Sequence, residues 1–257
     1  MENSNLSKKF FVNYFSNKIF IYLATFFITT FLWLHILNFE NDLSKLYHPW
    51  GYEGDGLLNL FIIKNWFFSD LIISNPKVGF PIIEKNNMVN YPFLIDFNSF
   101  IIFYISSFFT ENFILLKNIF LIIRPGIISI CSLFFFNKIS KNISINIFFS
   151  IIYSLSTYLQ LRGSAHFVIS NYYIVPIFLS FIHKYYFKLQ NENSKIKELF
   201  DIKFFIYIFL ITFSGVYFLY YFIITLFFLI FFLFMLNIYE YKKFFSFFLI
   251  TLFIIFL

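Results

Sequence analysis

The chain has 257 residues, of which 60% are hydrophobic and 26% aromatic, while only 12% are charged. Because a soluble domain has about a quarter of its residues charged, this composition excludes an ordinary soluble protein and indicates an integral membrane protein. The formal net charge of +6 does not indicate a nucleic-acid partner, since the basic residues lie mostly in short runs between hydrophobic segments, as in cytoplasmic loops of membrane proteins. The one cysteine, Cys131, lies in an apolar run, which excludes a disulfide or a cysteine-based metal site within the chain.

The first apolar segment runs from Ile19 to Leu37 and has about the 20 residues that a membrane helix needs. Residues 1–18 before it are polar and carry Lys8, Lys9 and Lys18, so the positive-inside rule places the N-terminus in the cytoplasm. A signal peptide is the alternative, but the apolar run is long and no small-residue cleavage site follows it. We therefore expect a retained first span at 19–37 that takes the chain to the outside.

Residues 38–112 are predicted to form a large external loop, and its first part, 38–97, holds seven of the 13 acidic residues. A connection of about sixty residues without a span is far longer than ordinary connections and is usually functional. Leu57 to Phe68 is apolar but too short to span, which favours a helix at the membrane interface. Three prolines and a glycine within 74–92 predict an ordered, non-helical stretch.

The region 98–137 is ambiguous. Asn98 to Phe109 is short for a span and is interpreted as another interfacial helix, and Phe113 to Phe136 as the second span. If 98–110 also crossed the membrane, every later orientation would invert and the lysine-rich connections would face outward, against the charge rule. Arg124 falls within the second span, where a charge is expensive and normally faces a protein or water-filled interior. A position near the membrane edge is the alternative for Arg124.

Five further apolar segments complete the predicted bundle, at 143–161, 167–182, 204–213, 216–236 and 244–257. With about seven spans, the lysine-bearing connections 138–142, 183–203 and 239–243 all face the cytoplasm. The predicted fold class is therefore all-α: one polytopic transmembrane helix bundle over 1–257, with the remaining spans in 113–257 after the long extracytoplasmic loop and its interfacial helices. Because the last segment is apolar to its final residue, we expect a truncated last span and an N-terminal fragment.

Glu53 and Asp55 mark the place where chemistry is expected. Gly54 separates them and Gly56 follows, so two carboxylates lie beside backbone that bends easily. Carboxylate oxygens are the ligands that hard divalent cations prefer, although a solvated turn is the alternative for so short a motif. The predicted topology favours a catalytic or metal-binding role over a solvated turn, because it puts the pair outside, between a span and an interfacial helix, close to lipid head groups.

With this arrangement the chain resembles the GT-C superfamily of polytopic membrane glycosyltransferases, which use lipid-phosphate sugar donors. Glu53-Gly54-Asp55 matches the acidic motif that this family carries in its first external loop, and 57–68 lies where its first juxtamembrane helix would lie. The resemblance covers about residues 19–240 and extends to uncharacterised bacterial membrane proteins of this type through four short motifs: 75–81, 90–92, 162–166 and 172–176.

The resemblance implies an enzyme of the bacterial cytoplasmic membrane that transfers a sugar from a polyprenyl-phosphate donor to an extracytoplasmic glycan or lipid acceptor of the cell envelope. Asp55 is then the catalytic carboxylate, and Glu53 is its partner. The two together are the candidate ligands of a divalent cation such as Mg²⁺ or Mn²⁺. Arg162, His166 and Lys77 are candidate ligands of the donor phosphate, with ordinary positions among lipid head groups or in solvent as the alternative.

Two other classes of function stay open: a transporter or flippase for a lipid-linked glycan, and a non-catalytic membrane subunit or truncated remnant. A transporter favours charges within several spans and broken helices in related positions of two halves. The sequence has only Arg124 clearly inside a span and no two-fold pattern. The glycosyltransferase is therefore the leading hypothesis.

Overall fold

The computed structural model is all-helical in the residues that it describes, which are 2–37, 43–48, 63, 97–156, 172–190, 199–236 and 241–256. The described helices are α1 (Glu2–Ile36), the 3-10 helix η2 (Leu43–Tyr47), α4 (Phe97–Ser107), α5 (Phe113–Ile139), α6 (Ile143–Ser154), α8 (Ile174–Gln190), α9 (Ile202–Thr212), α10 (Val216–Met235) and α11 (Tyr241–Phe256). No β-strand occurs in these ranges, so the predicted all-α class is confirmed there.

Three of the described helices contain stretches that are long and apolar enough to cross a membrane: Lys18–Ile36 in α1, Phe113–Ile139 in α5 and Phe218–Met235 in α10. Large apolar side chains point outward from the first and third of these, among them Phe20, Phe31 and Phe232. An apolar exterior of this extent suits lipid rather than water. The structure therefore supports insertion into a bilayer.

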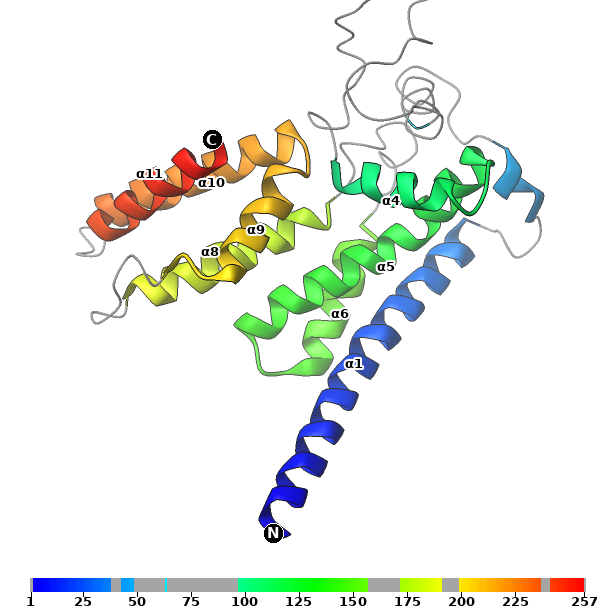
Figure 1. The fold of residues 1–257 in the computed structure, drawn as a ribbon, viewed down its shortest axis with the longest axis horizontal. Coiled ribbons are helices and arrows are strands. Elements are labelled where there is room, and N and C mark those ends of the chain that lie inside the picture. The colour runs from blue at the N-terminus through cyan, green and yellow to red at the C-terminus, as the bar shows by residue number, and fades with distance from the viewer. Residues whose placement is uncertain are drawn as a thin grey trace, which may run out of the picture.

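Seven of the described helices, α1, α5, α6, α8, α9, α10 and α11, alternate in direction along the chain (Figure 1). We name the two ends of this bundle by their contents. The loop end contains η2, α4, the start of α5 and the turn between α9 and α10. The lysine end contains the connections from α5 to α6, α8 to α9 and α10 to α11, with Lys138, Lys141, Lys184, Lys188, Lys203, Lys242 and Lys243.

The alternation follows the order of the seven predicted segments, but the number of true spans stays a prediction. Helices α6 and α9 have 12 and 11 residues, which at 1.5 Å per residue makes them about 18 and 16 Å long, shorter than a hydrocarbon core of about 30 Å. Helix α6 ends at Ser154, with Leu155 as its C-cap, and not at the predicted 161.

Helix α8 differs more from its predicted segment, 167–182. It is helical from Ile174 and continues through the lysine-bearing turns to Gln190. The predicted boundary followed hydropathy, which falls at His183 and Lys184. The helix nevertheless continues to Gln190, and its last turns contain Lys184 and Lys188, which form ion pairs with Asp201 at the start of α9.

Helix α4 bridges two parts of the loop end. The backbone N–H of Asn98 donates to Phe213 O at 3.3 Å, and its side-chain amide donates to Leu210 O at 3.2 Å. Phe103 is buried against Phe120 of α5, with ring centroids 5.5 Å apart. With 11 residues, α4 is too short to span, and its position at the membrane interface stays a prediction. The predicted interfacial helix at 57–68 lies outside the described residues except for Ile63, which is helical and buried.

Two packing arrangements hold the bundle together. Helix α1 crosses α5 at Gly126, where an added Cβ would lie 2.5 Å from Thr30 Oγ1 and 2.6 Å from the Phe26 ring. Helices α8, α9, α10 and α11 surround the buried Phe181, whose ring contacts those of Tyr185, Phe204, Phe222 and Phe247. This aromatic core fixes α8 against α9 at the lysine end.

Candidate functional site

The site residues predicted from the sequence lie outside the described residues, so their mutual geometry stays a prediction. They are Glu53, Asp55, Lys77, Arg162 and His166. The structure does describe the residues that flank the two segments containing them, and both segments begin and end at the loop end.

The first segment, which contains Glu53, Asp55 and Lys77, follows His48, the residue after the end of η2. The side-chain amide of Asn118 in α5 donates to Leu46 O and to His48 O, each at 2.8 Å. Asn118 is fully buried, so these two hydrogen bonds hold η2 firmly on α5. The segment with Glu53 and Asp55 therefore starts beside the first turns of α5.

The second segment lies between the end of α6 and the start of α8. Tyr153 of α6 donates its hydroxyl to Tyr172 O at 3.4 Å, which brings these two ends together. Arg124 of α5 lies within electrostatic range of Tyr172. The segment with Arg162 and His166 thus leaves and rejoins the bundle close to α5.

Two cations are buried in α5 near these flanks. Lys117 has no exposed surface and Arg124 has 1%, although charged side chains are almost never fully buried without a reason. They are seven residues apart, which places them on the same side of the helix and about 10 Å apart along its axis. Arg124 therefore faces the protein interior, as predicted, and its depth in the membrane stays a prediction.

The sequence interpretation missed Lys117 and Asn118. A signal was present, because Lys117 and Asn118 interrupt an otherwise apolar run two helical turns before Arg124. The Lys117 ammonium and the Arg124 guanidinium can together neutralise the charge of a phosphate group, since arginine binds phosphate oxygens through two parallel hydrogen bonds and lysine acts as a compact point charge.

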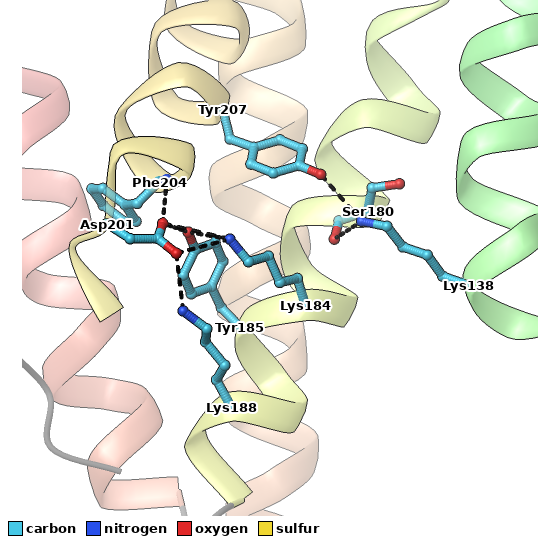
Figure 2. Close-up of polar contacts among 8 residues, drawn as sticks. All are labelled: Lys138, Ser180, Lys184, Tyr185, Lys188, Asp201, Phe204 and Tyr207. Atoms are coloured by element: carbon cyan, nitrogen blue, oxygen red, sulfur yellow. Dashed lines mark hydrogen bonds and ion pairs between the residues drawn. The ribbon is translucent and has the colours of Figure 1, made fainter. Parts of the chain in front are cut away.

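A second polar cluster lies at the lysine end and is shown in Figure 2. We call it the Asp201 cluster; it comprises Lys184, Tyr185, Lys188, Asp201 and the backbone N–H of Phe204. The Asp201 carboxylate caps α9 by accepting from Phe204 N at 2.8 Å, and it accepts from Tyr185 Oη at 2.8 Å. The ammonium groups of Lys188 and Lys184 lie 3.1 and 3.2 Å from the same carboxylate.

The electrostatics of the Asp201 cluster follow from these contacts. Burial opposes ionisation of Asp201, but hydrogen bonds from Tyr185, Lys188, Phe204 and Lys184 outweigh it and hold the carboxyl pKa far below its ordinary value of 3.8. Burial and the neighbouring carboxylate raise the pKa of Tyr185. Burial lowers the pKa of Lys184, although its hydrogen bond to Asp201 opposes this.

These contacts indicate a structural role for the Asp201 cluster. The carboxylate already accepts from four donors, and a proton-transfer group or metal ligand needs a lone pair directed at its substrate. The cluster joins the end of α8 to the start of α9. Lys138 extends the same network to α5, because its ammonium donates to Ser180 O at 3.2 Å and to Tyr207 Oη at 3.1 Å (Figure 2).

Within the described ranges, no group of three or more histidine, cysteine, aspartate or glutamate side chains could hold a metal ion. The predicted cation ligands Glu53 and Asp55 lie beyond those ranges, so the divalent cation stays a prediction.

The comparisons with known proteins identify no relative. No family model, curated protein or solved structure matches the chain. Its function has to be inferred from its own residues.

Proposed function

We propose that the protein is an integral membrane glycosyltransferase, which transfers a sugar from a polyprenyl-phosphate donor to a glycan or lipid acceptor outside the cytoplasmic membrane. The observation that carries this proposal is the buried pair Lys117 and Arg124 in α5. It lies beside the flanks of both segments that contain the predicted site residues.

The tether at Asn118 supports a short path between the acidic pair and these cations. Asp55 is seven residues beyond His48, and seven residues span at most about 25 Å even when fully extended. Asn118 holds the carbonyl oxygen of His48 and is adjacent to Lys117. The length of the chain alone therefore limits the distance between Asp55 and His48, which is held beside this part of α5, to about 25 Å.

The charges suit the leaving group of the reaction. Release of a sugar leaves an anionic polyprenyl phosphate, and positive charge in a site that excludes water stabilises such developing anions strongly. Ionisable residues inside a membrane segment are expensive and commonly mark a functional site. Lys117 and Arg124 meet this description.

In the proposed reaction, Asp55 accepts the proton of an acceptor hydroxyl. The hydroxyl oxygen then forms a bond to the anomeric carbon of the donor sugar, while the bond from that carbon to the donor phosphate oxygen breaks. The bonding electrons leave with the polyprenyl phosphate, whose negative charge Lys117, Arg124 and Arg162 attract. A divalent cation held by Glu53 and Asp55 would add positive charge to the same site.

The proposed topology has about seven spans and a cytoplasmic N-terminus. The clustering of lysines at one end of the alternating helices supports it, because cytoplasmic connections carry an excess of lysine and arginine. The loop end then faces outward, where the resemblance to the GT-C superfamily puts its catalytic loop.

Sugar transfer by the full chain in proteoliposomes tests the proposal. A panel of radiolabelled polyprenyl-phosphate hexoses serves as donors, and a membrane lipid extract supplies acceptors. We expect Asp55→Asn to lower transfer at least about 100-fold, because general base catalysis contributes factors of that size. Asp70→Asn, with the same charge change in the same loop, is the matched control and should transfer sugar at the rate of the unsubstituted protein.

Two results would contradict the proposal. Transfer by Asp55→Asn at the unsubstituted rate removes Asp55 as the catalytic carboxylate. Movement of an intact lipid-linked glycan across the bilayer, without transfer from any donor of the panel, indicates the flippase instead.

A further inference from the structure

A cavity at the lysine end lies between α1 and the turn that joins α5 to α6. It encloses about 620 Å³, and its described lining comprises Lys18, Ile21, Tyr22, Phe134, Asn137, Lys138, Ser140, Lys141 and Ile143. This volume is in the range of small-molecule sites. The cavity lies at the lysine end, whereas the described residues that flank the segments with the predicted site residues lie at the loop end.

The lining of this cavity is positively charged. It includes three lysines and, among its described residues, no carboxylate. The ammonium of Lys138 is directed towards α8 and α9, where it donates to Ser180 O and Tyr207 Oη (Figure 2). Lys18 and Lys141 are both exposed residues of the lining, and each adds a positive charge that attracts an anion.

Hydrogen bonds fix the polar wall of the cavity before any ligand arrives. The side-chain amide of Asn146, itself buried, donates to Asn137 Oδ1 at 2.7 Å and to Ser140 O at 2.9 Å. Asn137 in turn donates to Tyr22 Oη at 3.2 Å. The wall thus connects α1 to the turn after α5 in one arrangement, which lowers the entropy lost on binding.

The position of the cavity along the helices indicates the source of the anion. Lys18 is the first residue of the candidate span in α1, and Ile139 is the last of the candidate span in α5. The cavity therefore lies where two candidate spans end, at the level of lipid head groups. Phe134 and Ile143 in its lining are partly exposed apolar side chains, which suit contact with acyl chains.

We propose that this cavity binds the phosphate-bearing head group of an anionic membrane lipid. Lys18 and Lys141 attract the phosphate, and the acyl chains lie along Phe134 and Ile143. Basic pockets between transmembrane helices are known to bind anionic head groups in this way. The inference requires α1 and α5 to span the membrane, but it does not require sugar transfer.

Native mass spectrometry of the full chain in a neutral detergent tests the assignment, with phosphatidylglycerol and phosphatidylcholine as the titrated lipids. We expect the unsubstituted protein to prefer phosphatidylglycerol. The double variant Lys18→Gln/Lys141→Gln should lose affinity for it about 30-fold, given the contribution of each lysine near an anionic surface, while its affinity for phosphatidylcholine is unchanged.

Two control variants accompany this experiment. Lys18→Arg/Lys141→Arg keeps both charges and should keep the lipid preference. Lys242→Gln/Lys243→Gln removes the same charge from the lysine end at the start of α11, away from the cavity, and should bind phosphatidylglycerol as the unsubstituted protein does.

Three outcomes would overturn the proposal. The first is equal affinity of the unsubstituted protein for the two lipids. The second is an equal loss in the cavity variant and in the variant of Lys242 and Lys243, which indicates only a general effect of charge. The third is binding of inorganic phosphate as tight as that of phosphatidylglycerol, which assigns the cavity to free phosphate and not to a lipid.

Discussion

Two substitutions of Asp201 separate the contributions of its helix cap and of its negative charge to the free energy of unfolding. Asp201→Ala removes the cap of α9 and the carboxylate that accepts from Tyr185, Lys184 and Lys188, whereas Asp201→Asn keeps a capping oxygen and removes the charge. Loss of the cap costs about 1 kcal/mol. Loss of the acceptor leaves the hydroxyl of the buried Tyr185 without this partner, which costs about 1–3 kcal/mol.

The ion pairs contribute less. Lys184, Lys188 and Asp201 have side-chain exposures of 21%, 37% and 34%, so solvent screens them, and each pair is worth about 0.2–1 kcal/mol. We therefore expect Asp201→Ala to lower the free energy of unfolding by about 2–6 kcal/mol, and Asp201→Asn by about 0.5–2 kcal/mol. Lys188→Gln, which removes one partly exposed pair, should cost less than about 1 kcal/mol.

The assay is reversible unfolding of the full chain in mixed micelles, followed by circular dichroism as the fraction of denaturing detergent increases. The pH dependence provides an independent check. Because the pKa of Asp201 is lowered in the folded protein, its contribution is present above the unfolded pKa and is lost as the pH falls through the folded value. The stability difference between the unsubstituted protein and Asp201→Asn should therefore shrink as the pH falls below about 4. Equal losses in Asp201→Ala and Asp201→Asn, or a difference that does not change with pH, would refute this account.

Two further predictions concern α5. Asn118→Ala removes the 2.8 Å hydrogen bonds to Leu46 O and His48 O and should increase hydrogen exchange in residues 43–48. The control Asn146→Ala, at the lysine end, should leave exchange in residues 43–48 unchanged. Unaltered exchange in Asn118→Ala would show that other contacts hold η2. Gly126→Ala forces a Cβ against Thr30 and Phe26 and should lower the free energy of unfolding by about 1–3 kcal/mol, although alanine is the better helix former by about 1 kcal/mol. Adding Phe26→Ala should then cost less than Phe26→Ala costs alone, and strict additivity of the two changes would contradict the close crossing of α1 and α5.

Hydropathy predicted those parts of the fold that depend on local sequence. The segments 19–37, 113–136 and 216–236 each lie within a few residues of the candidate spans that the structure contains. Length and apolar composition are sufficient for such helices, because a bilayer imposes both requirements on the segment itself.

Features that depend on distant partners were not predictable in the same way. Helix α8 continues beyond 182 into turns whose lysines pair with Asp201, more than ten residues later. The tether of η2 to Asn118 likewise joins residues some seventy positions apart. Neither contact leaves a periodic pattern in the sequence. The acidic pair Glu53 and Asp55 stays a prediction, made from its residue types and spacing and strengthened by the predicted topology.

The crossing of α1 and α5 at Gly126 also has a consequence for the biogenesis of the protein. Roughly ninety-five residues separate Thr30 from Gly126, so at about 5–20 residues per second the ribosome needs on the order of ten seconds to supply the partner of α1. During this interval α1 has no contact with α5. The hydroxyls of Thr25 and Thr29, which become buried in the bundle, donate to Ile21 O and Thr25 O of their own helix at 2.8 and 2.7 Å. These two hydroxyls therefore already donate hydrogen bonds within α1 before α5 is synthesised. When α5 packs against α1, no hydrogen bond of either threonine has to break.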